Sequence, residues 1–254
     1  MSAVDPPGGL IQRPSPKLRY AFTHPDPPLT PVGFLDDLKR QADAAKATQN
    51  TDSATLARNA ALVDAACKTA FAYFATLGQQ LQVLQPVSTV RYRLDNRHVF
   101  EGLKRCEFRA DARRKQWRGA EVCDHVVLNF QLKSGTRVSI TKDFLPDIEK
   151  IESRLRQSAA TVDREPVHNP DNGKLQEVRY AFTADFHASV RINPDHDRGV
   201  LQFQLMNLDG FENLSVEFSA IEVGSARLDE LARWLVGEPH EFLKDGQQLR
   251  RVEA

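Results

Sequence analysis

The fold is decided by a six-residue stretch that occurs twice: Val127–Leu132 reads VLNFQL, and Val200–Leu205 reads VLQFQL. Apolar and polar residues alternate in both copies, which is the two-residue period of a strand that buries one face. The copies share a Val-Arg-Tyr tripeptide upstream and a helix-like octet downstream, at residues 90–92 and 148–155 in the first copy and at 178–180 and 228–235 in the second. Three landmarks in one order predict a duplicated unit of antiparallel strands followed by a helix.

Chance similarity is the alternative explanation of this repeat. Strands favour Val, Leu and Phe in any protein, so short apolar matches also arise without duplication. The tripeptide and the strand motif start 37 residues apart in the first copy (127 − 90) and 22 residues apart in the second (200 − 178). A true duplication therefore requires that the extra residues of the first copy form one insertion.

The composition is that of an ordinary globular protein. The 254 residues are 41% apolar and 27% charged, and the formal net charge is zero. A chain of this length forms one large domain or two small ones. Because its net charge is zero, the protein as a whole has no electrostatic attraction to nucleic acid or membrane. No apolar run reaches the roughly 20 residues that span a bilayer, and Met1–Gly9 lacks the features of a signal peptide. We therefore expect no membrane partner.

Cysteine usage indicates the compartment. The chain has three cysteines, Cys67, Cys106 and Cys123. A small and odd number of cysteines does not suit a disulfide framework and favours a reducing environment. We therefore expect a cytoplasmic location.

The chain is expected to begin with a tail that leads into helices. Residues 1–32 hold eight of the fourteen prolines, and proline removes a backbone donor and fixes φ, which predicts a flexible tail. Within it, Arg19–Thr23 recurs as Arg179–Thr183, either by coincidence or because the tail adds a strand to a sheet edge. The segment 33–86 is expected to be helical, with a helix over 33–47, an interruption at 48–53 and a long helix over 54–85 that stops at Pro86.

The long helix carries a heptad seam. Its apolar positions alternate steps of four and three residues: Leu56, Ala60, Val63, Cys67, Ala70, Phe74, Leu77, Leu81 and Leu84. Apolar flanks widen this face beyond a two-stranded seam: Ala57, Ala61, Ala66, Phe71 and Tyr73. We therefore expect the helix to pack within its own domain. The alternative is self-association, or a protein partner, through this helix.

Two β-rich units are expected after the helix. The first spans 87–161 and the second 175–237, with a polar linker over 162–174 and a polar C-terminal tail over 238–254. Expected strands lie at 88–94, 99–110, 124–133, 136–142, 180–192, 200–208 and 213–223, and expected helices begin at 145 and 225. Ser134-Gly135 predicts a hairpin turn. The predicted fold class is α+β, with a Pro-rich N-terminal tail, a long helix and two related antiparallel β-meander-plus-helix units.

Common catalytic and metal-binding motifs are missing from the sequence. It has no Gly-rich phosphate loop, no G-x-S-x-G and no H-E-x-x-H. One group of thiols and imidazoles has the residue types that suit zinc but not the spacing, so buried cysteines and solvated histidines are the favoured interpretation: Cys106, Cys123, His125 and His98. The row Asp185, His187 and Ser189 is interpreted as a solvated sheet face, because side chains in a row on one strand do not converge as a triad. We expect no cofactor and no metal.

The basic stretch Lys104–Arg118 is the best functional candidate. It holds seven cations against two acids, and it lies where the first copy of the repeat is longer than the second. Arginine binds phosphate bidentately, and an aromatic ring stacks on a base. The candidate anion-binding residues are therefore Arg105, Arg109, Arg113, Arg114, Lys115, Trp117 and Arg118. The alternative is a charged hairpin tip whose arginines pair with acidic residues of the second unit.

These patterns favour a non-enzymatic cytoplasmic module that binds or interacts with a protein, since the common catalytic motifs are missing and the frame is repeated. The first alternative is a binder of nucleic acid or another polyanion through the basic insertion 104–118. The second alternative is an enzyme with an unrecognised site.

Overall fold

A computed structural model describes residues 34–253 of the chain. The chain divides into two units, Met1–Ala47 and Thr48–Ala254. Of the first unit, the structure describes only the start of helix α1 (Phe34–Leu84). The predicted Pro-rich tail over 1–32 and the fragment Arg19–Thr23 lie outside the described residues.

The predicted interruption of the helix at 48–53 is wrong, because α1 continues through it. The segment reads TQNTDS and contains neither Gly nor Pro. Its residues are weak helix formers that cost only tenths of a kcal/mol each, which is not enough to break a helix. The predicted end before Pro86 agrees with the last helical residue, Leu84.

The middle of the heptad seam of α1 packs within its own domain, as predicted, and its partner is the sheet; Leu84 at the end of the seam is 68% exposed. The buried residues of α1 are Val63, Ala66, Cys67, Ala70, Phe74, Gly78 and Leu81. Gly78 marks a close approach, because a Cβ added there would lie 3.5 Å from Leu128 Cδ1 and 3.6 Å from Phe108 Cβ. By length and composition alone α1 could also cross a membrane, although the sequence was expected to contain no such run. Within that apolar window, 28% is buried.

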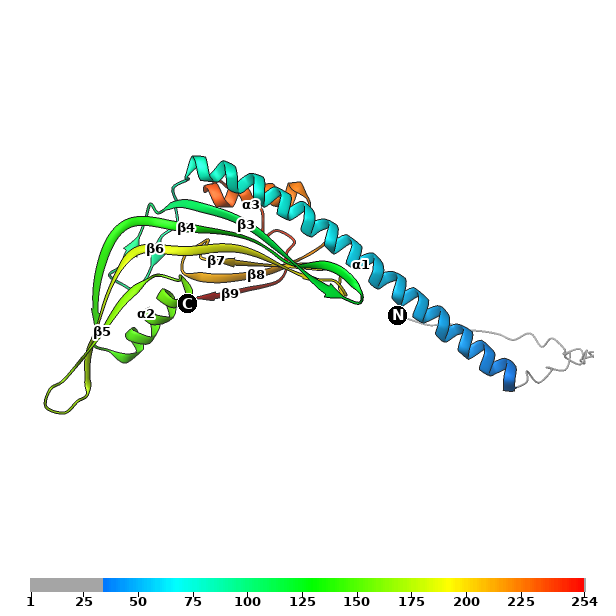
Figure 1. Cartoon of the computed structure of the whole chain (residues 1–254), viewed down its shortest axis with the longest axis horizontal. Helices are drawn as coiled ribbons and strands as arrows, with labels where there is room; N and C mark the ends of the chain where they lie inside the picture. Colours follow the sequence, from blue (N-terminus) through cyan, green and yellow to red (C-terminus); the bar gives the residue numbers. More distant parts are fainter. Residues whose placement is uncertain (1–33, 254) are drawn as a thin grey trace, which may run out of the picture. The chain divides into compact units, whose positions relative to one another are not determined.

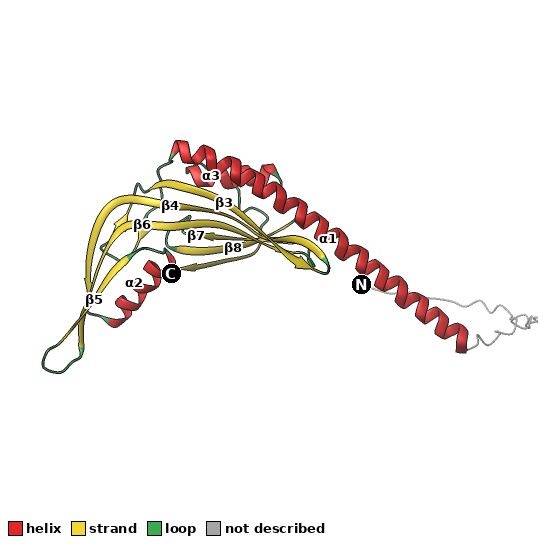
Figure 2. Cartoon of the chain, in the orientation of Figure 1, coloured by secondary structure: helices red, strands yellow, loops and turns green. Residues whose placement is uncertain are grey.

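The β-strands form one large antiparallel sheet and one small ribbon (Figure 2). The large sheet has seven strands in the order β3-β4-β6-β7-β8-β9, with β5 also paired to β6. Their bounds are β3 Lys104–Trp117, β4 Ala120–Lys142, β5 Val162–His168, β6 Leu175–Asp195, β7 Val200–Met206, β8 Glu212–Ser219 and β9 Gln247–Glu253. The ribbon pairs β1 (Tyr92–Arg93) with β2 (Val99–Phe100), and the other helices are α2 (Leu145–Gln157) and α3 (Ser225–Val236). The fold is mixed α+β.

One face of this sheet carries the core. Alternate residues of β6 are buried along its length, as its sequence predicts: Tyr180, Phe182, Ala184, Phe186, Ala188, Val190 and Ile192. Helices α1 and α3 lie side by side (Figure 1), where the Tyr73 hydroxyl donates to Asp229 Oδ1 over 2.6 Å. The opposite face of the central strands has polar side chains.

The predicted hairpin at Ser134-Gly135 is wrong. β4 runs through this point as one strand and pairs with β6 on both sides, with an irregular register between Lys133 and Arg137. The backbone N–H groups of Ser134 and Gly135 both donate to Asp185 Oδ1, each over 3.1 Å. A carboxylate of the neighbouring strand therefore accepts the backbone N–H groups that the bulge leaves unpaired, and β4 continues without reversing direction.

Two segments expected to be irregular form edge strands instead. The predicted linker 162–174 contains β5, which pairs with β6 at the edge of the sheet. An edge strand tolerates Pro166 because a missing backbone N–H can face solvent there without the loss of a hydrogen bond between strands. The predicted polar tail 238–254 contains β9, which pairs with β8. Both segments lack the apolar alternation that reveals a half-buried strand.

The structure does not confirm the duplication. The two apolar triplets are buried as expected: Leu128, Phe130 and Leu132 on β4, and Leu201, Phe203 and Leu205 on β7. β4 and β7 flank β6 in the same sheet. However, α2 follows β4 directly, whereas β8 stands between β7 and α3. The two segments therefore do not match strand for strand.

Candidate functional site

The basic stretch forms β3 and the turn of a hairpin with β4. Arg118 and Gly119 occupy the turn, both with positive φ (47° and 79°). Two consecutive residues with positive φ are typical of the tight turns that join twisted antiparallel strands. Register shifts next to Cys106 and Arg113 change which side chains share a face. These shifts divide the seven candidate residues among three environments.

Arg105 is part of the core. Its side chain is 1% exposed, and it donates to the carbonyl oxygen of Leu235 at the end of α3 over 2.8 Å and to Ser88 Oγ over 3.1 Å. Burial lowers the pKa of this guanidinium. Arg105 therefore ties α3 to the sheet and does not contribute to a surface that binds anions.

Three other cations are already paired with carboxylates. Arg114 lies 3.5 Å from Asp64 Oδ1 on α1, and Lys115 lies 3.1 Å from Asp124 Oδ1. Arg118 forms an ion pair with Asp197 over 2.9 Å. These contacts agree with the predicted alternative of a charged tip paired with acids, and the acid that Arg118 meets belongs to the second β-rich unit.

Trp117 is half-buried and packs against its neighbours. The Arg118 guanidinium lies 4.4 Å from the centre of the Trp117 ring, and the His196 ring lies 5.5 Å away. His196 is in turn fixed by a contact of 2.8 Å between its Nε2 and the carbonyl oxygen of Cys123. Trp117 therefore supports the hairpin tip.

Arg109 and Arg113 remain available on the polar face of the sheet. Arg109 lies opposite Asn129 of β4, and Arg113 lies opposite His125. Directly opposite residues of an antiparallel pair point to the same side, and Asn129 alternates with the core residue Leu128. Both arginines are exposed, and within residues 34–253 neither is recorded in an ion pair.

The polar face continues over the rest of the sheet. One row crosses four strands, because Arg191 of β6 lies opposite Gln204 of β7, Gln204 opposite Ser215 of β8, and Ser215 opposite Arg250 of β9. These strands form a hollow of about 490 Å³. Its lining residues are Ser189, Arg191, Gln202, Gln204, Met206, Asn213, Leu214, Ser215, Arg250 and Val252. Neither Trp, Tyr nor Phe lines it.

The charge balance of this face is positive. Arg191 donates from Nε to Asn193 Oδ1 over 2.8 Å, and neither Arg191 nor Arg250 forms an ion pair with a carboxylate of the described residues. Glu217 is held by Arg198 over 2.8 Å. Asp111 lies between Arg109 and Arg113 along β3, and its Oδ1 accepts the N–H of Ala112.

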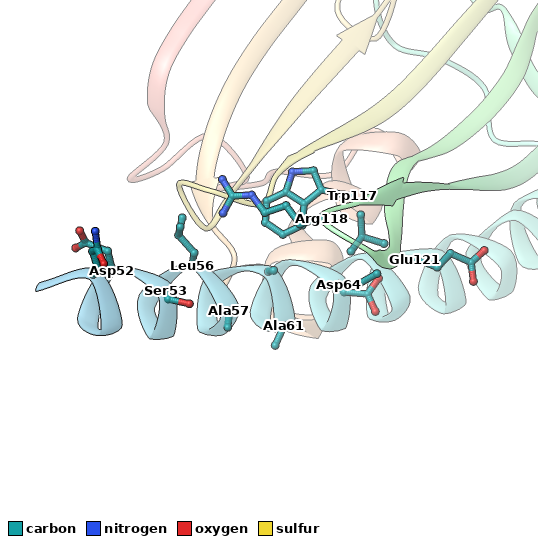
Figure 3. A pocket seen from close by; sticks show the side chains of 13 residues that line it. Asp52, Ser53, Leu56, Ala57, Ala61, Asp64, Trp117, Arg118 and Glu121 are labelled. Atoms are coloured by element: carbon teal, nitrogen blue, oxygen red, sulfur yellow. The ribbon is translucent and has the colours of Figure 1, made fainter. Parts of the chain in front are cut away.

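A second hollow of about 710 Å³ lies between α1 and the hairpin tip. Figure 3 shows Trp117 and Arg118 facing the helix across it. Its lining residues are Gln49, Asp52, Ser53, Leu56, Ala57, Ala60, Ala61, Asp64, Trp117, Arg118, Ala120, Glu121 and Val122. Three of its charged lining residues, Asp64, Arg118 and Glu121, already have partners, so this groove offers mainly apolar surface.

The sequence contains two chemical constellations, a thiol–imidazole group and the row Asp185, His187 and Ser189. Among residues 34–253 there is no group of three or more His, Cys, Asp or Glu side chains that could hold a metal ion. Asp185, His187 and Ser189 lie in a row on β6, as expected. Asp185 Oδ1 is occupied by two backbone N–H groups, and burial lowers the pKa of His187.

The sequence pointed to Arg109 and Arg113 but not to Arg191 and Arg250. Arg191 is recognisable as a polar-face residue from the alternation of β6, whereas β9 lacks any such pattern. Only strand pairing, which brings residues 191 and 250 into one row, reveals the surface. No family model, curated protein or solved structure matches this chain.

Proposed function

We propose that this protein is a non-enzymatic binding module whose ligand surface is the open polar face of the sheet, and that its ligand is a linear polyanion. The observation that supports this is a set of four guanidinium groups without carboxylate partners on that face: Arg109, Arg113, Arg191 and Arg250. Arginine binds phosphate, sulfate and carboxylate groups through paired N–H donors.

The sheet face suits this role better than the hairpin tip. At the tip, Arg114, Lys115 and Arg118 would have to leave their carboxylates before they could bind another anion. On the sheet face the cations are available, and amide and hydroxyl side chains such as Gln202, Gln204 and Ser215 supply further hydrogen bonds.

The expected recognition is independent of base sequence. A surface for single-stranded nucleic acid normally adds aromatic side chains on which bases stack, and the residues that line the hollow include none. Binding should therefore depend on the charged backbone of the ligand. Four phosphate contacts on a single strand give a slope of about −3 in a plot of log K against log salt concentration.

Binding to an immobilised oligothymidylate of thirty nucleotides and to immobilised heparin tests the proposal. We expect the wild-type protein to be retained at low salt, and the double variant Arg191→Glu, Arg250→Glu to lose retention. The matched control is Arg91→Glu, Arg97→Glu, which changes the net charge equally at exposed positions outside the seven-stranded sheet. Circular dichroism should show all three proteins folded.

Two results would contradict the proposal. One is the absence of wild-type retention on both matrices at low salt. The other is an equal loss of retention in the two double variants, which would indicate net charge and not a site. Retention on only one matrix would distinguish phosphate from sulfate as the preferred group. We also propose a cytoplasmic location, which the three free thiols support.

A further inference from the structure

The hollow on the polar face of the sheet has neutral hydrogen-bonding groups between its two arginines. Arg191 and Arg250 stand at the ends of one row across the strands, and Gln204 and Ser215 lie between them. Neighbouring strands lie about 4.8 Å apart, so three steps separate the backbones that carry the two arginines by roughly 14 Å. The positive charges are therefore divided by a strip of uncharged polar side chains.

The neutral side chains of the hollow are available to a ligand. Gln204 forms one long side-chain hydrogen bond, from its Nε2 to Gln202 Oε1 over 3.4 Å, and its own Oε1 can still accept. Within residues 34–253 the side chains of Asn213 and Ser215 form no hydrogen bond. Ser189 lines the same hollow at 9% exposure, and its hydroxyl has no partner in the described part of the chain. Since hydroxyls this deeply buried are normally hydrogen-bonded, this position suits a polar group of a ligand.

The chemistry of this strip matches a sugar hydroxyl. Amide and hydroxyl side chains both donate and accept hydrogen bonds, and the 2′-hydroxyl of ribose does the same. Deoxyribose has only C–H groups at that position, so the same side chains would lose bound water and gain no hydrogen bond from DNA. The strip therefore distinguishes the two sugars, whereas the arginines bind the phosphates of either nucleic acid.

We propose that the polyanion bound by this face is RNA, with Gln204 and Ser215 at the 2′-hydroxyl groups and Arg191 and Arg250 at the flanking phosphates. This inference rests on the proposed function, because it names the ligand of the same surface. An acidic polysaccharide also carries hydroxyls between its charged groups. The cytoplasmic location that the three free thiols support favours RNA over a polysaccharide of the cell exterior.

Two oligonucleotides that differ only in the sugar test this inference on the full chain. Oligouridylate and oligodeoxyuridylate of thirty nucleotides share their bases, length and charge, so a difference in affinity reports the 2′-hydroxyl alone. We expect the wild-type protein to bind the ribose form about tenfold more tightly, which corresponds to two hydrogen bonds of ordinary net strength. Both affinities should fall with salt along the same slope, because the phosphate contacts are the same.

The double variant Gln204→Ala, Ser215→Ala should lose this preference. Its affinity for the deoxyribose form should stay at the wild-type value, because no charge is removed, and its affinity for the ribose form should fall to the same value. The matched control is Gln79→Ala, Gln80→Ala, which removes two exposed amides of α1 and should keep the tenfold preference. Circular dichroism should show that both variants are folded.

The outcomes separate this inference from the proposed function. Equal wild-type affinity for the two oligonucleotides would overturn the choice of RNA and leave polyanion binding intact, whereas binding of neither at low salt would overturn both. A preference that survives in the Gln204→Ala, Ser215→Ala variant would overturn the assignment of these side chains. Polygalacturonate that displaces bound oligouridylate more effectively, charge for charge, than free oligouridylate would identify an acidic polysaccharide instead.

Discussion

Replacement of Phe74 by alanine should lower the free energy of unfolding by about 4 kcal/mol. Phe74 lies on the seam of α1 that faces the sheet, and its side chain is 0% exposed. Loss of the buried ring costs roughly 2 kcal/mol in transfer free energy. A residual cavity of roughly 100 Å³ adds about 2.4 kcal/mol at 24 cal/mol per Å³. The sum lies within the range of about 3–5 kcal/mol for Phe to Ala in a core.

Phe71 is the matched control for this prediction. It lies on the same helix, three residues away, and is 39% exposed. Phe71→Ala should therefore cost on the order of 1 kcal/mol or less. Urea unfolding followed by circular dichroism measures both changes, provided that the m-value stays constant. A cost below about 1 kcal/mol for Phe74→Ala, or a larger cost for Phe71→Ala, would refute the assignment of the seam to the core and favour a partner helix.

Two pH-dependent predictions follow from buried or paired groups. Burial opposes the ionisation of Asp95, but hydrogen bonds from His98 and Lys142 hold its pKa below the usual 3.8, so its contribution to stability is present above pH 3.8 and is lost as the pH falls further. Asp95→Asn should therefore destabilise the protein at pH 7, and the difference from wild type should shrink when unfolding is measured in acid. A difference that grows in acid would contradict this reasoning. Burial and a hydrogen bond to Glu152 raise the pKa of Tyr180 from 10 to about 12, which favours the neutral phenol in the folded state, so the stability it contributes should be lost between pH 10 and 12. Tyr180→Phe should reduce this alkaline loss, as measured by urea unfolding at pH 8 and pH 11, and an unchanged loss would contradict it.

Local patterns in the sequence predicted the elements that bury one face. The seam of α1, the alternation of β6 and the helix over 225–236 all follow from apolar periodicity. The same reasoning failed where a long-range partner decides the outcome. Ser134-Gly135 has the residues of a turn, but the carboxylate of Asp185 on the neighbouring strand holds it within a strand.

The candidate site shows the same limit. Arg105 looks like any other cation of the basic stretch, and only the carbonyl of Leu235, 130 residues later, explains its burial. The pairing of Arg118 with Asp197 was foreseen only as a general alternative. Arg191 and Arg250 belong to one surface because β7 and β8 lie between their strands, and no local pattern in the sequence encodes that order.

The most direct test of the proposed surface is to observe the arginine side chains during binding. Arginine Nε–Hε resonances of the labelled protein can be followed by NMR as the thirty-residue oligothymidylate is added at low salt. We predict that the resonances of Arg109, Arg113, Arg191 and Arg250 shift, whereas those of Arg114 and Arg118 stay unchanged. Shifts confined to Arg114 and Arg118, or no shift in any arginine, would contradict binding at the polar face of the sheet.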